Sequence, residues 1–187
     1  AASDVYKRQD KIIRNNQVRI IKDMKSYRVG EGRIHIREAS SQPAQADIVI
    51  SLINKYVKNG GTVVATYLTA YVNENTLAYL GGFPGAGLGE VFGLYAEELD
   101  TLYPTDSNAV LMKDGNKALV KDYCELIKLT GAEVLGTYES DFYAGMPAVT
   151  VHSYGKGKAY YIGTRMEEAD LIKFFTPISV SYTHLRA

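Results

Sequence analysis

The chain has 187 residues, 46% of them hydrophobic, which suits a single globular domain with a sizeable core. Its 21 basic and 21 acidic side chains give a formal charge of zero, which argues against nucleic acid or an anionic membrane surface as a partner. A lone cysteine excludes an intrachain disulfide. The chain also lacks a secretory signal and an apolar run of the roughly 20 residues that span a membrane, so we expect a cytoplasmic protein.

Both ends of the chain differ in pattern from the rest. Residues 1–9 and 177–187 show no hydrophobic periodicity and resemble translated adapter sequence, so we expect both ends to be non-native. The domain is then expected over residues 10–176, as a piece of a longer reading frame.

The first part of the domain predicts helix, strand, helix and strand in that order. Residues 10–25 predict a short helix and residues 27–36 a strand. Pro43 can open the next helix, which Gly60 ends because glycine accepts the left-handed conformation at a C-cap. The apolar face of this helix consists of Ile48, Leu52, Ile53, Tyr56 and Val57. Residues 62–67 are β-branched and almost wholly apolar, which predicts a strand covered on both faces.

The middle of the chain has one long helical pattern. Before it come a short helix or turn at residues 73–80, a glycine-rich loop at 81–89, a helical turn at 90–94, and strands at 95–99 and 109–112. Residues 116–130 predict the best helix, with Asn116 as its N-cap and Gly131 as its stop. Its apolar face is formed by Leu119, Val120, Tyr123, Ile127 and Leu129.

The last part of the domain predicts a strand, a hairpin and a helix. The strand covers residues 132–138, and residues 149–154 and 158–162 form the two arms of a hairpin. A terminal helix is expected at residues 167–175, with Leu171, Ile172 and Phe175 packed inward. Strands that alternate with helices favour right-handed crossovers, so the expected class is α/β, a three-layer sandwich with a mostly parallel sheet and a late β-hairpin.

The loop Gly81–Gly89 does not match a nucleotide-binding fingerprint. Gly85 and Gly87 supply the first half of the G-x-G-x-x-G pattern, but its third position is Glu90, whose charge would repel a pyrophosphate. The lysine of a P-loop is also missing. We therefore expect a tight surface loop and no cofactor.

Cys124 is the candidate nucleophile. An amidotransferase needs its cysteine at a strand-to-helix elbow, whereas Cys124 falls inside the predicted helix at 116–130. We expect it to act as a small apolar residue. The lysines of Gly155-Lys156-Gly157-Lys158 are expected to lie in a solvated turn.

Glu97, Glu98 and Asp100 are candidates for the carboxyl pair of a glycosidase. Retaining hydrolysis needs two carboxyl groups about 5–5.5 Å apart across a sugar-binding cleft. Adjacent residues of a strand point to opposite faces, so Glu97 and Glu98 do not converge. We expect a solvated or interface acidic patch.

His35, His152 and Asp141 are candidates for a metal or proton-transfer site. Neither histidine has a second histidine at helical i, i+4 spacing, and no cysteine cluster accompanies them. The sequence therefore predicts no metal site, and it predicts no catalytic residue.

Five short sequence blocks are weak signals separately but informative when they occur together in one order. They are Tyr56–Thr62, Gly81–Gly85, Glu97–Asp100, Asp141–Ala148 and Gly155–Tyr161. In this order, over about residues 48–161, they resemble the middle domain of the glycoside hydrolase family 42 β-galactosidases.

The resemblance implies a flavodoxin-like or class I glutamine amidotransferase-like fold that makes homotrimer contacts and carries no catalytic carboxylate. It implies a catalytic barrel upstream with the acid/base and nucleophile glutamates, and a small β domain downstream. The parent reaction would be retaining hydrolysis of terminal β-D-galactosides. The fragment alone is expected to be inactive.

The expected interface lies on two aromatic loops flanked by glycine, one with Phe83 and Pro84 and the other with Phe142 and Tyr143. Exposed aromatic side chains are good interface anchors. The alternative is that these side chains only cap the sheet.

One segment departs from the family pattern. Residues 30–37 are too charged for the central parallel strand that the resemblance implies before the helix ending at Gly60. A frameshift or a mis-joined read would explain the departure, which extends over residues 10–46.

Two other functions remain open. A free-standing amidotransferase-like enzyme would need a nucleophile elbow, and none is visible. A stand-alone sugar-binding or scaffolding module agrees with the 15 tyrosines, since tyrosine suits both sugar-facing surfaces and subunit interfaces.

Overall fold

The computed structural model describes residues 18–20, 27–29, 32–34, 42–73 and 77–184. The chain divides into two units, residues 1–52 and residues 53–187. The first unit holds a three-stranded antiparallel sheet of β1 (Val18–Ile20), β2 (Tyr27–Val29) and β3 (Gly32–Ile34). Helix α2 (Gln42–Lys58) begins in the first unit, and its last turns belong to the second.

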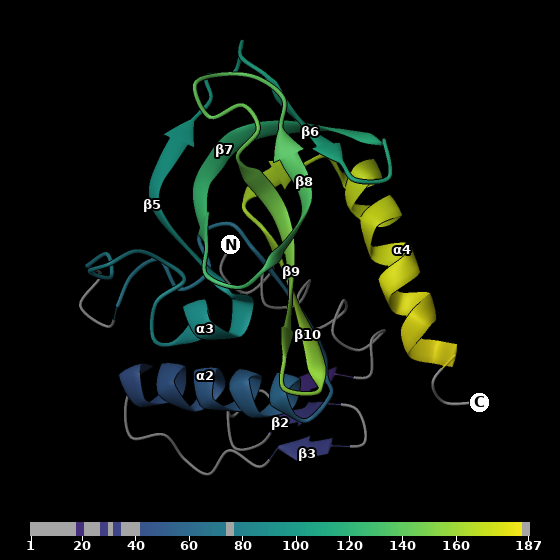
Figure 1. The fold of residues 1–187 in the computed structure, drawn as a ribbon. Helices are drawn as coiled ribbons and strands as arrows, with labels where there is room; N and C mark the ends of the chain where they lie inside the picture. Colours follow the sequence, from purple (N-terminus) through teal and green to yellow (C-terminus); the bar gives the residue numbers. More distant parts are fainter. Residues whose placement is uncertain (1–17, 21–26, 30–31, 35–41, 74–76, 185–187) are drawn as a thin grey trace, which may run out of the picture. The chain divides into compact units, whose positions relative to one another are not determined.

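The second unit is built on an eight-stranded mixed sheet in the order β11-β7-β6-β8-β9-β10-β4, with β5 paired to β7 (Figure 1). Its strands are β4 (Thr62–Thr66), β5 (Leu94–Thr101), β6 (Asn108–Met112), β7 (Lys117–Leu129), β8 (Glu133–Tyr138), β9 (Pro147–Tyr154), β10 (Gly157–Ile162) and β11 (Thr164–Met166). Its helices are α3 (Leu88–Phe92) and α4 (Glu168–His184). No helix in the described ranges is long and apolar enough to cross a membrane.

The expected mostly parallel sheet is wrong, although the α/β class is confirmed. Only β4 and β10 pair in parallel, and every other recorded strand pair of this sheet is antiparallel. The reason is that short turns join several consecutive strands, as between β6 and β7 or β9 and β10, and a short turn forces antiparallel pairing. The flavodoxin-like arrangement is therefore not confirmed.

The predicted helix at residues 116–130 is also wrong, because these residues form the longest strand, β7. Ala118 and Val120 are buried while Leu119 between them is 52% exposed, which is the alternation of a strand. Asp122 takes a left-handed φ of 65°, after which residues 124–127 are buried consecutively. Apolar residues lie on both faces of this strand, and their combined spacing imitates that of a helix. Pairing with β6, β11 and β5 outweighs this local helical preference.

The structure places Asn116 in the tight turn before β7 and not at a helix N-cap. The backbone N–H of Asn116 donates to Asp114 Oδ1 at 2.9 Å, and its side-chain amide donates to Asp114 Oδ2 at 2.8 Å. These bonds hold the pKa of the Asp114 carboxyl below its ordinary value. An Asp and an Asn two residues apart are typical of such turns. The sequence therefore favoured a turn at Asn116 as well as the helix N-cap that was expected there.

Several other predicted elements are confirmed with shifted ends. Helix α2, strands β4, β5, β6 and β8, the turn at α3, and the hairpin of β9 and β10 lie where they are expected. The expected burial of both faces of β4 is wrong: β4 is only half-buried, and in the described residues it is an edge strand that pairs with β10 alone. The described residues among 71–80 contain no helix, and an antiparallel bridge joins Val72 to Ala78.

The elements predicted before residue 37 differ from the described structure. Residues 18–20 are a strand where a helix is expected, and residues 27–34 contain two short antiparallel strands in place of one. The remaining residues of 10–26 and residues 35–36 lie outside the described residues. Among the described residues, the eight-stranded sheet takes no strand from this part of the chain.

The terminal helix packs through different residues from those expected. Leu171 and Phe174 of α4 contact the core, and the Phe174 ring lies 6.0 Å from the Tyr160 ring. Ile172 and Phe175 are exposed. Phe174 and Phe175 both follow Leu171 at helical spacing, and only one of the two can face the sheet. The sequence analysis therefore chose the wrong phenylalanine as the buried one.

The core cluster consists of Val110, Ala118, Val120, Cys124, Leu126, Tyr138, Tyr143, Ala148, Val149, Ile162 and Met166. Strands β6 to β11 supply it, together with the loop after β8. The buried Tyr138 hydroxyl is satisfied within this core, because it donates to the Gly163 carbonyl at 2.9 Å.

Replacing Val120 by Ala tests the strand assignment of β7. Removing two buried methyl groups should lower the free energy of unfolding by about 2 kcal/mol, measured by urea denaturation. Leu119→Ala, at the exposed neighbouring position, should cost less than about 0.5 kcal/mol. Equal losses at both positions would contradict a strand, because a helix would place these neighbours on one apolar face.

Candidate functional site

The loop with Phe83 and Pro84 is buried within the chain. Phe83 bridges to Ala96 through two backbone hydrogen bonds of 2.9 and 2.7 Å, and its ring lies edge-on to Tyr71 at 4.9 Å. Gly82 has a φ of 98°, and a Cβ there would lie 2.7 Å from the Ala96 carbonyl oxygen, so only glycine fits. Phe83 and Pro84 are both buried, so they support the loop and offer little exposed surface.

The loop between β8 and β9 exposes one aromatic side chain and buries the next. Phe142 is 75% exposed, whereas Tyr143 is fully buried and its hydroxyl donates to Asp100 Oδ2 at 2.8 Å. Asp141 takes a left-handed φ of 72°, and its side chain accepts from the Phe142 backbone N–H at 2.7 Å. The buried tyrosine therefore anchors the loop and holds Phe142 out in solvent. The sequence did not distinguish these two roles.

A second exposed apolar surface, which sequence reasoning missed, lies on residues 71–80. We call it the apolar hairpin and define it by Tyr71, Val72, Leu77 and Leu80, all exposed, with Leu80 fully so. The Asn73 backbone N–H donates to the Leu77 carbonyl at 2.8 Å, and residues 74–76 lie outside the described residues. Two leucines within a segment expected to be a helix or turn, just before Gly81-Gly82, were the signal available in the sequence.

The base of the apolar hairpin is fixed. The Gly85 N–H donates to the Ala70 carbonyl at 3.0 Å, and the Tyr79 ring lies against Gly85 where a side chain would clash. A surface held in one conformation loses less entropy when it binds. The apolar hairpin and Phe142 therefore have the exposure expected of binding surfaces.

Glu125 on β7 is a fully buried carboxyl group that sequence reasoning also missed. Its Oε1 accepts from the Leu68 backbone N–H at 2.6 Å, and its Oε2 accepts from the Tyr161 hydroxyl at 2.9 Å. Burial raises the pKa of Glu125 from 4.5 to about 7, against the opposing effect of these two hydrogen bonds. An acidic residue inside an apolar segment was the only signal in the sequence.

The other candidates for chemistry do not converge. Cys124 is buried in a strand, its pKa raised by burial, and its Sγ lies 3.8 Å from Thr164 Oγ1. Glu97 and Glu98 are exposed beside a β-bulge. The Asp100 carboxylate accepts a hydrogen bond from the Tyr143 hydroxyl. These groups form no pair that could serve as acid and nucleophile.

Metal ligation finds no support in the part of the chain that the structure describes. His152 Nδ1 lies 2.9 Å from the Val91 carbonyl, and no three His, Cys, Asp or Glu side chains gather around a point there. His35 lies outside the described residues.

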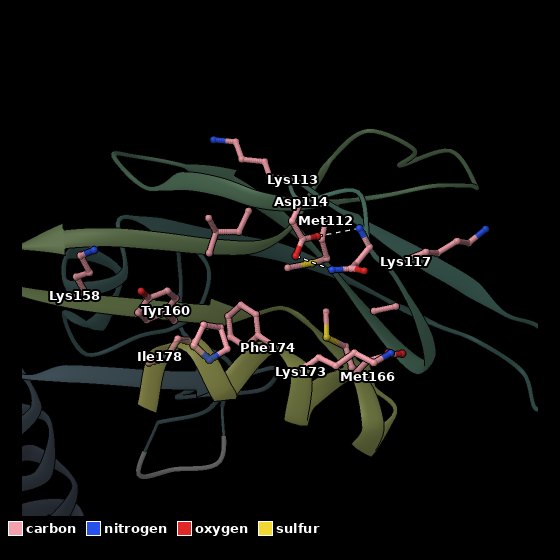
Figure 2. Close-up of a pocket in the computed structure, with 15 residues that line it drawn as sticks. Met112, Lys113, Asp114, Lys117, Lys158, Tyr160, Met166, Lys173, Phe174 and Ile178 are labelled. Atoms are coloured by element: carbon pink, nitrogen blue, oxygen red, sulfur yellow. Dashed lines mark hydrogen bonds and ion pairs between the residues drawn. The ribbon is translucent and has the colours of Figure 1, made fainter. Parts of the chain in front are cut away.

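A cavity of about 450 Å³ lies between α4 and the sheet (Figure 2). Its apolar lining includes Met112, Leu135, Tyr160, Met166, Phe174 and Ile178. Lysines stand at its rim, and ion pairs engage three of them: Lys113 with Glu133, Lys117 with Glu139 and Lys173 with Asp170. The cavity therefore presents an apolar interior, and its two lining carboxyl groups, Asp114 and Asp170, are engaged by Asn116 and Lys173.

Comparison with known proteins identifies the sequence family. Residues 45–183 match the family described as "Beta-galactosidase trimerisation domain". The chain is 46% identical over 141 residues to β-galactosidase Pbg of Clostridium perfringens, covering 72% of this chain and 20% of that protein. It is 48% identical over 126 residues to β-galactosidase LacA of Lactobacillus acidophilus, covering 67% of this chain and 19% of the relative.

Solved structures of β-galactosidases also resemble this chain. The chain superimposes on Gan42B, a GH42 β-galactosidase from G. stearothermophilus, with a TM-score of 0.67 and 46% identity, covering 72% of this chain and 19% of that one. It matches the β-galactosidase from Rahnella sp. R3 with a TM-score of 0.66 and 43% identity, covering 70% and 20%. The chain thus spans about a fifth of the length of these relatives.

The buried Glu125 predicts how stability depends on pH. Its pKa is higher in the folded chain, about 7, than in the unfolded chain, so the folded chain binds the extra proton between these values. The free energy of unfolding should therefore fall by up to about 3 kcal/mol as the pH rises from 4.5 to 7. Urea denaturation at several pH values measures it.

Glu125→Gln is the matched variant, because glutamine keeps the shape and both hydrogen-bonding positions without a titrating group. The difference in stability between this variant and the original chain should change with pH in the window from 4.5 to 7. A difference that stays constant across this window would contradict the assignment.

Proposed function

The chain belongs to the β-galactosidase trimerisation domain family, and we propose that it is the assembly domain of a glycoside hydrolase family 42 β-galactosidase with no catalytic residue of its own. The observation that carries the proposal is the family match over residues 45–183. The structure supports it with exposed apolar side chains in two loops of the second unit, at Phe142 and at the apolar hairpin.

The parent enzyme would hydrolyse terminal β-D-galactosides with retention. That reaction needs two carboxyl groups about 5–5.5 Å apart beside a sugar-binding cleft. In the described residues, Glu125 is buried without a second carboxyl group among its hydrogen-bond partners, and Glu97 and Glu98 are solvated. We therefore assign the chemistry to a catalytic barrel elsewhere in the parent protein.

We propose that the partner of this domain is two further copies of itself. A closed ring of three copies joins one surface of each copy to a different surface of the next, so each chain needs two distinct binding surfaces. Phe142 and the apolar hairpin are suited to be these surfaces. Of the four residues expected at the interface, Phe142 would make the contact, while Phe83, Pro84 and Tyr143 would hold the loops behind it.

We place the assembled protein in the cytoplasm. A single cysteine that is buried and free of disulfides accords with a reducing compartment. An amidotransferase-like activity has no support, because Cys124 lies inside a buried strand where burial raises its pKa and disfavours the reactive thiolate.

Replacing Phe142 tests the assembly role. Phe142→Ser should weaken self-association of the 187-residue chain by roughly tenfold to a hundredfold, because a buried aromatic anchor contributes about 2 kcal/mol at an interface. Sedimentation velocity over a range of concentrations measures the change. Tyr103 provides a control because it is an equally exposed aromatic residue, at 74%, on a different loop.

Tyr103→Ser should leave self-association unchanged. If the two variants weaken it equally, or if Phe142→Ser has no effect, the interface is not at Phe142. Neither variant should change the free energy of unfolding, measured by urea denaturation, by more than about 0.5 kcal/mol, since both side chains are exposed.

A further inference from the structure

The turn that follows β4 covers Glu125. This turn, residues 67–70, is called the lid here. Its Leu68 N–H donates to Glu125 Oε1, and its Ala70 carbonyl accepts from Gly85 at the base of the apolar hairpin. The lid is therefore joined to the buried carboxyl on one side and to an exposed apolar surface on the other.

The lid is held in a strained conformation. Leu68 has a φ of 61° and Ala70 a φ of 48°, and side-chain-bearing residues adopt this left-handed region only at an energetic cost. Local hydrogen bonds from Thr69 to the Thr66 carbonyl, at 2.6 Å from the hydroxyl and 3.3 Å from the N–H, help to hold the turn. Contacts made by the lid must offset the strain.

Among the described residues, no cation neutralises Glu125. From β10 it faces the Tyr161 hydroxyl, and from β8 the Tyr138 hydroxyl donates to its backbone carbonyl at 3.2 Å. From β5 its pairing partner is Leu99. No lysine, arginine or histidine in the described residues contributes to its pKa shift. Removing the lid would admit water to the carboxyl group, which an ionised carboxylate favours strongly.

We propose that the lid is a proton-sensitive cover, closed over Glu125 while the carboxyl is neutral and released when the carboxyl ionises. Closure holds the base of the apolar hairpin in place, and release frees it. The proposal concerns the chain itself and does not depend on the assembly function.

The direction of the pH effect on lid opening follows from the difference in the pKa of Glu125 between the closed and open states. With the lid closed the pKa of Glu125 is about 7, and with the carboxyl in water it returns to about 4.3. The equilibrium constant for opening should therefore rise about tenfold for each pH unit between roughly 4.5 and 7, and level off above 7. Acid closes the lid and neutral to alkaline pH opens it.

Hydrogen exchange at the Leu68 amide of the 187-residue chain tests the proposal. After correction for the intrinsic exchange rate, its protection factor should fall about fortyfold between pH 5 and pH 7. It should also stay well below that of core amides such as Val149, because the lid opens without global unfolding. In Glu125→Gln, the protection of Leu68 should vary less than about threefold over this range.

Three results would overturn the proposal. They are equal protection of Leu68 and Val149 at every pH, protection of Leu68 that does not change with pH, and the same pH dependence in Glu125→Gln. If that variant does not fold, the ¹³C shift of the Glu125 carboxyl in the unmutated chain takes its place. Its titration midpoint must coincide with the pH at which Leu68 protection stops falling, and a clear separation of these two pH values would contradict the lid.

Discussion

The second unit depends on one strand, β7, and on the pairing that this strand makes along its length. Its first residues pair with β6, its middle with β11 and its last residues with β5. It supplies Ala118, Val120, Cys124 and Leu126 to the core cluster. It also carries Glu125, so the longest strand of the sheet also holds the buried carboxyl group. A disturbance of β7 would reach the core, the lid and both exposed surfaces together.

The sequence was most informative where local chemistry decides the conformation. The end of α2 near Gly60, the turn between β9 and β10, and the position of β4 all follow from glycine placement and β-branched composition. The sequence failed at β7, because lysines and leucines with high helix propensity were placed in a strand by long-range pairing. The parallel sheet was wrong for the same reason, since one misassigned helix changes the expected connection between its neighbours.

The candidate surfaces show a similar limit. Glycine-flanked aromatic residues directed attention to the correct loops, but tertiary contacts decide which ring is exposed. A hydrogen bond to Asp100 buries Tyr143 and leaves Phe142 outside, and the bridge to Ala96 buries Phe83. Glu125 could not be placed from sequence, because its burial follows from the return of residues 67–70 over the sheet. The described residues bring no two carboxyl groups together as hydrolysis would require, which agrees with the proposal that this domain acts through surfaces presented to a partner.

The central claim is that this chain is an assembly domain, and the mass of the 187-residue chain in solution tests it most directly. Sedimentation equilibrium from low to high micromolar concentration would measure that mass. For an assembly domain, we expect this mass to approach three times the 20.6 kDa of one chain as concentration rises. A mass that stays at 20.6 kDa across the whole range, with the chain folded, would contradict the claim.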